Sequence, residues 1–213
     1  LKQKVTAGAF FYAPAGEAWS ITGPKKASRV TLFQKKFEPL AGVAAPQAII
    51  GNAAEVPGQP FLGDPDARLQ VLLPDVPAFD LAMNIFTYQP GATLPFVETH
   101  VMEHGLLMLA GQGVYRLEDS WYPVAAGDVI WMASYCPQWF VAMGKTPASY
   151  LYYKDVNRAA VCKYMKMITL DAAKLLGATG ESKIDASLDA IEVASTLLMT
   201  RALYSSDAFV ASY

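Results

Sequence analysis

Both histidines of the 213-residue chain, His100 and His104, lie within six residues of Glu98. Side chains alternate between the two faces of a β-strand, so residues an even number apart leave the same face. Glu98, His100 and His104 therefore share a face, whereas Glu103 has the opposite parity and is expected in solvent. One carboxylate and two imidazoles on one face are suitable ligands for a divalent metal. The alternative is that these are surface histidines or hydrogen-bonded core histidines, but the spacing and the apolar flanks favour a metal site.

Composition narrows the possible classes of protein. The chain is 53% hydrophobic and 17% charged, with a formal net charge of −2. A hydrophobic core is therefore available, and the lack of a basic stripe argues against a nucleic-acid partner. No apolar run reaches the roughly 18 residues of a membrane span, and Cys136 and Cys162 do not make a disulfide framework. The chain begins without Met or a signal-like segment, so we expect a processed form or a fragment. Its N-terminus therefore does not indicate a cellular compartment.

The apolar stretches are short, rich in aromatic residues and interrupted by Gly and Pro, which is typical of strands rather than helices. Strands at this spacing, separated by turn residues, predict an all-β barrel or sandwich. The expected strands are Ala9–Ala13, Trp19–Thr22, Arg29–Phe37, Ala82–Gln89, Thr93–His100, His104–Ala110, Val114–Leu117, Trp121–Val124, Val129–Ala133, Trp139–Ala142 and Ser149–Lys154.

An internal repeat indicates how the chain is divided. When the sequence is shifted by 119 positions, Ala7 meets Ala126 and Lys35 meets Lys154. Residues 1–38 are therefore expected to be the closing strands of a first, truncated barrel. That copy contains no histidine, so we expect no metal site in it.

The other segments differ in character. Residues 39–78 are rich in Pro, Ala and Gly and are expected to be a connector that lies along a surface. Residues 79–158 carry the dense strand pattern of a complete barrel. Residues 159–213 are expected to be a helical tail, with helices at Thr169–Leu176 and Ser182–Leu203 that pack on a barrel or partner and are unnecessary for chemistry.

The spacing of ligands and glycines resembles the two cupin motifs. Gly91, the Glu98-x-His100 pair, His104 and Gly111 match the first motif. In the second motif, Gly127-Asp128 is followed by Pro137-Gln138, where most cupins have a histidine. Together with the stretches ETHVMEHGLL, CPQW and YKDVNR, this pattern resembles the bicupin family of (S)-ureidoglycine aminohydrolases. The resemblance extends over residues 1–158, is strongest over 79–158, and fails over the tail.

The resemblance implies a cupin-type β-barrel protein, a bicupin whose first lobe is truncated here. It implies a Mn²⁺ site with Glu98, His100, His104 and Gln138 as ligands. It also implies a small ureide substrate contacted by Glu98, Tyr115, Tyr150 and Lys154, with Glu98, Tyr150 and Lys154 as catalytic residues. The implied reaction releases ammonia from (S)-ureidoglycine and forms (S)-ureidoglycolate in purine and allantoin catabolism. A homo-oligomer is implied as well, located in the endoplasmic reticulum if plant-type and in the cytoplasm if bacterial.

The residues are compatible with this chemistry. Lys154 is a point charge suited to a carboxylate, and tyrosine hydroxyls can donate hydrogen bonds. The alternatives are that Tyr115 and Tyr150 are ordinary barrel-lining aromatics and that Lys154 is a solvated strand end. For the whole protein, two other functions remain open: a metal-dependent cupin oxidase or dioxygenase acting on a small acid, and a non-catalytic binding or storage bicupin.

Overall fold

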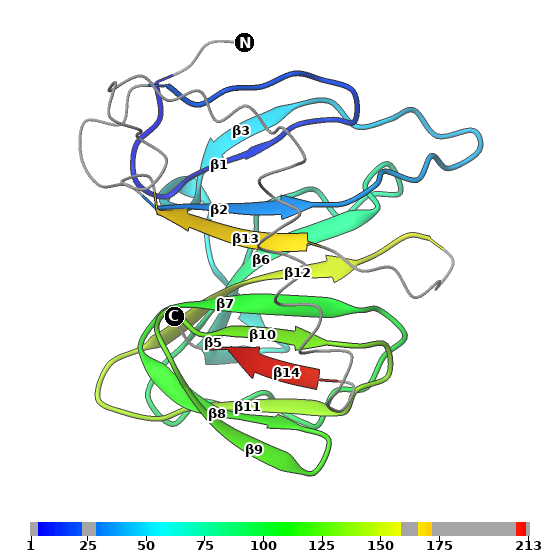
Figure 1. Ribbon diagram of the computed structural model, residues 1–213. Helices are drawn as coiled ribbons and strands as arrows, with labels where there is room; N and C mark the ends of the chain where they lie inside the picture. The colour runs from blue at the N-terminus through cyan, green and yellow to red at the C-terminus, as the bar shows by residue number, and fades with distance from the viewer. Residues whose placement is uncertain (1–3, 23–28, 159–165, 172–207, 212–213) are drawn as a thin grey trace.

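The computed structural model describes residues 4–22, 29–158, 166–171 and 208–211 (Figure 1). Strands dominate these ranges, and the one helical element within them is the 3₁₀ turn η1 (Ala53–Glu55). Within the same ranges, no helix has the length and apolar character needed to cross a membrane. The prediction of an all-β protein is confirmed for the part of the chain that the structure describes.

The larger body is built from two antiparallel sheets that enclose a core. The seven-stranded sheet has the order β14-β10-β7-β12-β6-β5-β4, and the three-stranded sheet has the order β11-β8-β9. Both sheets contribute buried side chains to one core, which includes Phe86, Leu106, Tyr115 and Phe140. The strands are β4 (Gln59–Phe61), β5 (Asp64–Val71), β6 (Leu81–Tyr88), β7 (His104–Ala110), β8 (Gln112–Leu117), β9 (Ser120–Ala125), β10 (Val129–Met132), β11 (Gln138–Ala142), β12 (Ala148–Asp155) and β14 (Ala208–Ala211).

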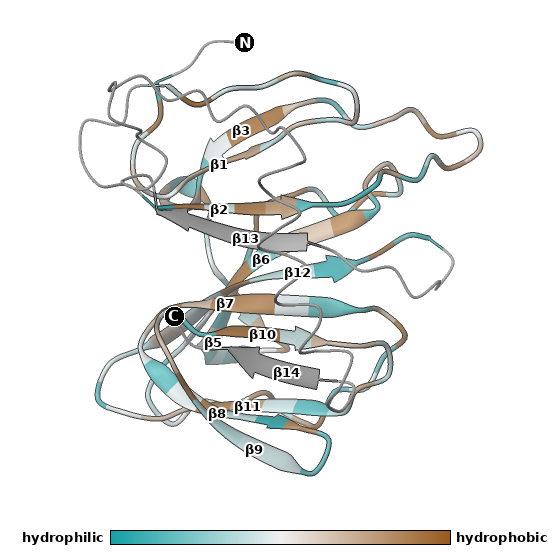
Figure 2. Cartoon of the chain, viewed as in Figure 1, coloured by the Kyte–Doolittle hydropathy of each residue, from teal (hydrophilic) through white to brown (hydrophobic). Residues whose placement is uncertain are grey.

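Alternation of side chains along the central strands explains why they form and which face they bury. The even-numbered residues of β12 face the core. The residues of β7 that face it are His104, Leu106 and Met108. The apolar part of β7 is visible as a brown segment in Figure 2. Gly111 joins β7 to β8 with φ of 69°, a left-handed conformation that glycine adopts without strain. At Gly111 the chain therefore passes from the seven-stranded sheet into the three-stranded sheet, and β8 lies over the same core that β7 covers.

A smaller layer covers the outer face of the barrel. It contains β1 (Ala9–Tyr12) paired with β3 (Ile49–Asn52), and β2 (Arg29–Gln34) paired with β13 (Lys166–Asp171). In Figure 1 these strands lie above β6 and β12. Tyr12 packs edge-on against Phe79, and Phe33 against Tyr153, with ring centroids 5.2 and 5.6 Å apart. The outward-facing side of β12 is therefore covered by protein and not by water.

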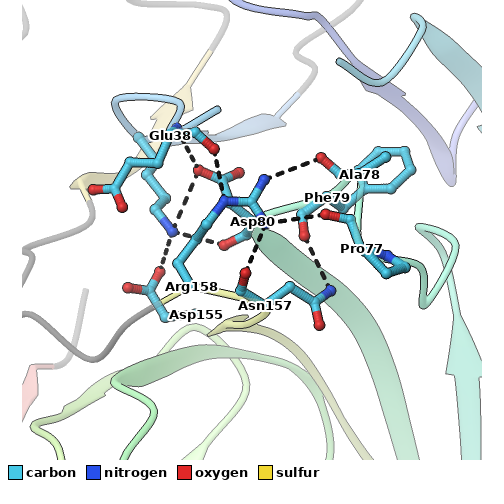
Figure 3. Close-up of polar contacts among 9 residues, drawn as sticks. Glu38, Pro77, Ala78, Phe79, Asp80, Asp155, Asn157 and Arg158 are labelled. Atoms are coloured by element: carbon cyan, nitrogen blue, oxygen red, sulfur yellow. Dashed lines mark hydrogen bonds and ion pairs between the residues drawn. The ribbon is translucent and has the colours of Figure 1, made fainter. Parts of the chain in front are cut away.

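Polar contacts connect the two layers beside this aromatic contact (Figure 3). The Lys35 ammonium donates to Asp155 Oδ1 at 2.6 Å and to the Asp80 carbonyl at 2.6 Å. The Glu38 amide donates to Asp80 Oδ2, and the Arg158 Nε donates to the Glu38 carbonyl at 2.6 Å. Asp80 precedes β6 and Asp155 ends β12, so the contacts fasten the adjacent ends of two paired barrel strands to the covering layer.

Several strand predictions were wrong. Trp19–Thr22 forms no strand, and Thr93–His100 makes only isolated bridges at Thr93 and Glu98. Residues 39–78, expected to be a connector that lies along a surface, contain β3, η1, β4 and β5. The reason is that edge strands such as β4 tolerate proline, since one side of an edge strand needs no ladder hydrogen bonds.

The predicted helical tail was wrong where the structure describes it. Residues 169–171 belong to β13, which pairs with β2, and residues 208–211 form β14 beside β10. The edges of β2 and β10 present backbone N–H and C=O groups that need partners. Pairing with these edges favoured strands over the helices that the spacing of apolar residues predicted. The remainder of the predicted helices, including Ser182–Leu203, lies outside the described residues.

Candidate metal and substrate site

Two separate segments bring the predicted ligands to one end of the barrel. Gln138 opens β11 and is bridged by backbone hydrogen bonds to Glu98, with N–O distances of 2.8 and 2.9 Å. The His100 carbonyl accepts from the Tyr135 amide at 2.7 Å. His104 begins β7, where its partner across the ladder is Lys154. The ligand segment between residues 92 and 103 is thus anchored on β11 and delivers its side chains to the interior.

The side chains of His100, His104 and Gln138 meet at the Gln138 amide. Gln138 Oε1 lies 2.8 Å from His104 Nε2, and Gln138 Nε2 lies 3.2 Å from His100 Nε2. The Tyr115 hydroxyl donates to the same Oε1 at 2.9 Å. His100 Nδ1 lies 3.0 Å from the Met102 carbonyl and donates to it, which leaves Nε2 as the atom with the lone pair. Two imidazole Nε2 atoms and one amide therefore face a common point.

Burial, assisted by neighbouring charges, explains why the imidazoles of His100 and His104 are neutral. Burial lowers the pKa of His104 well below its usual value, and the Lys154 and His100 charges act in the same direction. Burial also lowers the pKa of His100, again with Lys154 assisting. Burial raises the pKa of the Glu98 carboxyl, against the opposing effect of Lys154. Both histidines are consequently held neutral, which is the form that binds metals.

The donor set fits a divalent cation in several respects. Both imidazoles are neutral, their Nε2 atoms approach the same amide, and the backbone carbonyl of Met102 orients His100 in the way that outer hydrogen bonds orient metal-binding histidines. Within the part of the chain that the structure describes, His104 Nδ1 is buried and has no hydrogen-bond partner. Among the described residues, however, no three His, Cys, Asp or Glu side chains are grouped closely enough to hold an ion. The membership of Glu98 in the ligand set therefore stays a prediction.

The predicted substrate residues lie on the same interior surface. Tyr115 and Tyr150 are 1% and 3% exposed, and the Tyr150 hydroxyl lies 3.0 Å from the Tyr88 hydroxyl. Lys154 is partly buried opposite His104. Burial lowers the pKa of the Lys154 ammonium, while the Glu98 carboxylate opposes that shift. The structure therefore places Lys154 opposite His104 in the ladder, whereas the hydroxyls of the two tyrosines are occupied by contacts within the protein.

The expectation that Glu103 is in solvent was wrong. Its side chain does face away from His104, as parity predicted, but the residue is only 3% exposed. Its Oε1 accepts hydrogen bonds from Trp131 Nε1 at 2.8 Å and from the Tyr153 hydroxyl at 3.1 Å. The covering layer lies over this face of the barrel, so the carboxylate is enclosed between the two layers.

Sequence reasoning also missed other inward-facing residues of the barrel. Asn84 and Tyr88 of β6 and Tyr152 of β12 line the same interior face as Lys154. The Asn84 amide donates to the Tyr152 hydroxyl at 2.9 Å, and the Tyr152 ring centroid lies 6.3 Å from that of His104. Burial raises the pKa of Tyr152 to about 12, with smaller effects from Asn84 and Glu98. Tyr152 has the parity of Tyr150 and Lys154, which is the sequence signal that points to it.

Two facing sheets enclose one core, and the predicted ligands lie together at one end of it. The cupin domain family model matches residues 84–153, and the chain therefore contains a cupin domain. The sequence is also similar to curated relatives that are named (S)-ureidoglycine aminohydrolase. The protein from Arabidopsis thaliana is 42% identical over 161 residues, 73% of this chain and 51% of the relative. The protein from Escherichia coli K12 is 38% identical over 153 residues, 71% of this chain and 58% of the relative.

Solved structures agree with these similarities. The E. coli protein Ylba superimposes with a TM-score of 0.50 and 38% identity, covering 59% of this chain and 47% of that one. A Pseudomonas aeruginosa protein gives a TM-score of 0.53 and 35% identity, covering 60% and 48%. The resemblance inferred from the motifs is confirmed. The chain spans about half the length of the curated relatives it matches.

Proposed function

We propose that the cupin domain of this chain hydrolyses (S)-ureidoglycine to (S)-ureidoglycolate and ammonia. In this reaction the oxygen of a water molecule replaces the amine nitrogen on the carbon: the carbon–nitrogen bond breaks, a carbon–oxygen bond forms, and one proton of the water passes to the departing nitrogen, which leaves as ammonia. The similarity to relatives of that name supports the choice of substrate. The observation that carries the proposal is the position of Lys154 across the ladder from His104, because it places a cation for the substrate carboxylate beside the predicted ligands.

The residues of the chain have distinct tasks in this proposal. Lys154 binds the carboxylate of the substrate and fixes the orientation of the reacting carbon. Glu98, whose carboxyl is close enough to Lys154 to affect its pKa, takes a proton from the attacking water and transfers it to the leaving nitrogen. Tyr115 acts on Gln138, since its hydroxyl donates to the Gln138 amide oxygen. Tyr115 therefore orients that amide, and its contact with substrate is indirect.

We further propose that His100, His104, Gln138 and Glu98 hold Mn²⁺. Imidazole nitrogen and carboxamide or carboxylate oxygen are suitable donors for this ion. When bound, the metal acts as a Lewis acid that polarises the substrate. Binding requires Gln138 Oε1 to exchange its contact with His104 Nε2 for the ion. The neutral state of both imidazoles supports this exchange, since no proton has to leave a charged histidine.

The test is a direct assay of the purified 213-residue chain. Elemental analysis after loading with Mn²⁺ measures the bound metal, and ammonia release from freshly prepared (S)-ureidoglycine measures the reaction. We expect about one metal per chain and ammonia release that depends on it. Bound metal without ammonia release would reject the aminohydrolase and favour a binding cupin. Oxygen consumption with a small acid such as oxalate would instead identify an oxidase. Light scattering of the same sample tests the homo-oligomer that we propose.

A further inference from the structure

The β12 strand presents a third inward tyrosine, Tyr152, between Tyr150 and Lys154. We propose that Tyr152, with its hydroxyl oriented by Asn84, donates a hydrogen bond to the substrate carboxylate that Lys154 binds. This inference rests on the proposed function and assigns a specificity-determining residue at the same site. The ligand class is a small carboxylic acid, with one carboxylate oxygen facing Lys154 and the other facing Tyr152.

Exposure distinguishes Tyr152 from the other tyrosines of the site. Tyr115 and Tyr150 are almost fully buried, and their hydroxyls contact Gln138 and Tyr88. Tyr152 is partly exposed, as are Lys154 and Glu98. Tyr152 and Lys154 are therefore the partly exposed inward residues at this end of β12, whereas Tyr115 and Tyr150 are buried and their hydroxyls are already engaged.

The hydrogen bond from Asn84 determines what the Tyr152 hydroxyl can do. Asn84 is 7% exposed, and its Nδ2 donates to the Tyr152 oxygen at 2.9 Å. A tyrosine hydroxyl has one proton, which it can still donate when its oxygen accepts a bond. Within the described part of the chain, Tyr152 makes no hydrogen bond besides this one. The hydroxyl proton is therefore left for an acceptor that enters the site.

The strand geometry places this donor correctly for a carboxylate. Asn84 and Tyr152 are partners across the β6–β12 ladder, and the next inward pair is Ala82 with Lys154. Two residues on one strand face are about 7 Å apart, and the small Ala82 side chain leaves room beside Lys154. A carboxylate between the two side chains can accept one hydrogen bond from each. The Tyr152 ring also faces His104, so the bound acid lies next to the predicted metal ligands.

The decisive variant is Tyr152→Phe, which keeps the ring and removes the hydroxyl. Loss of a hydrogen bond to a carboxylate is expected to lower kcat/KM for (S)-ureidoglycine roughly 10- to 150-fold. Binding of the stable product (S)-ureidoglycolate, measured by calorimetry, should weaken by a similar factor. The matched control is Tyr153→Phe, the neighbouring tyrosine on the opposite face. Its hydroxyl donates to Glu103, so the control should lower the melting temperature and leave kcat/KM unchanged.

The role of Asn84 is tested by coupling. Asn84→Leu should lower kcat/KM in the parent chain but have little further effect in the Tyr152→Phe background, because Asn84 acts through that hydroxyl. Additive losses would overturn the orienting role. If Tyr152→Phe retains the parent kcat/KM and product affinity, the substrate contact is overturned whatever Asn84 does.

The product titration separates this inference from the proposed function. If the parent chain releases no ammonia, the aminohydrolase proposal fails, but the affinities of the parent and Tyr152→Phe chains for (S)-ureidoglycolate still decide the Tyr152 contact. A parent chain that does not bind (S)-ureidoglycolate at all would overturn the contact as well.

Discussion

Replacing Lys35 by methionine should destabilise the protein strongly. The Lys35 ammonium lies 2.6 Å from Asp155 Oδ1 and 3.6 Å from Asp80 Oδ2, and the side chains of Lys35 and Asp80 are 8% and 5% exposed. Methionine keeps the length and apolar stem of lysine but provides no charge and no hydrogen-bond donor. Two carboxylates at the ends of β6 and β12 would then face each other without the cation between them.

The magnitude follows from the burial of the partners. Removing one member of a buried ion pair typically costs about 3 to 5 kcal/mol, because a charge is left without a partner. The Asp155 side chain is 21% exposed, so water can partly compensate, and we expect a loss near the lower limit, about 3 kcal/mol. For a chain of this size each kcal/mol changes the melting temperature by about 2 to 4 °C. The expected decrease is therefore about 6 to 12 °C.

Thermal unfolding followed by circular dichroism measures this decrease. The matched control is Lys36→Met, the adjacent lysine, which is exposed and should change the melting temperature by no more than about 2 °C. A Lys35→Met chain that melts within 2 °C of the parent would refute the reasoning. It would mean that the contacts between the covering layer and the barrel ends do not stabilise the folded protein.

Three further variants test the site and its surroundings. His100→Ala should lose most of the bound Mn²⁺ by elemental analysis, since one ligand is removed, and full occupancy would contradict the assignment. Lys154→Met should retain the metal but lower kcat/KM for (S)-ureidoglycine roughly 30- to 1000-fold; turnover at the parent rate would remove the carboxylate-binding role. Trp131→Phe removes a donor to buried Glu103 and should lower the free energy of unfolding in urea by about 1 to 3 kcal/mol, with ammonia release unchanged. Unaltered stability would show that Glu103 does not depend on this contact.

The sequence alone predicted the central strands and the residues that meet at the candidate site. The expected strand His104–Ala110 coincides with β7, and Ser149–Lys154 lies within β12. Both strands are rich in apolar and aromatic residues and are bounded by turn residues, so local pattern and tertiary packing favour the same conformation. The spacing of the cupin motifs also predicted that His100, His104 and Gln138 lie together, as their side-chain contacts show. Strand parity did not decide this, because Glu98 and His100 lie outside the regular strands.

Only the tertiary structure decided which surfaces are covered. Parity placed Glu103 opposite His104, but the covering layer determines whether that face meets water or protein. The same layer explains why the Lys35 side chain is buried against the barrel. Its partner Asp155 is 120 residues away in the sequence, and no local sequence pattern predicts a contact over that separation. Strand β13 overlaps the start of the helix predicted at Thr169–Leu176, and β14 lies within the tail predicted to be helical. The edges of β2 and β10 offer backbone partners that the sequence of the tail does not reveal. Parity predicted that Tyr150 and Lys154 share one face of their strand, but hydrogen-bond partners contributed by other strands decide which tyrosine hydroxyl is left for a ligand.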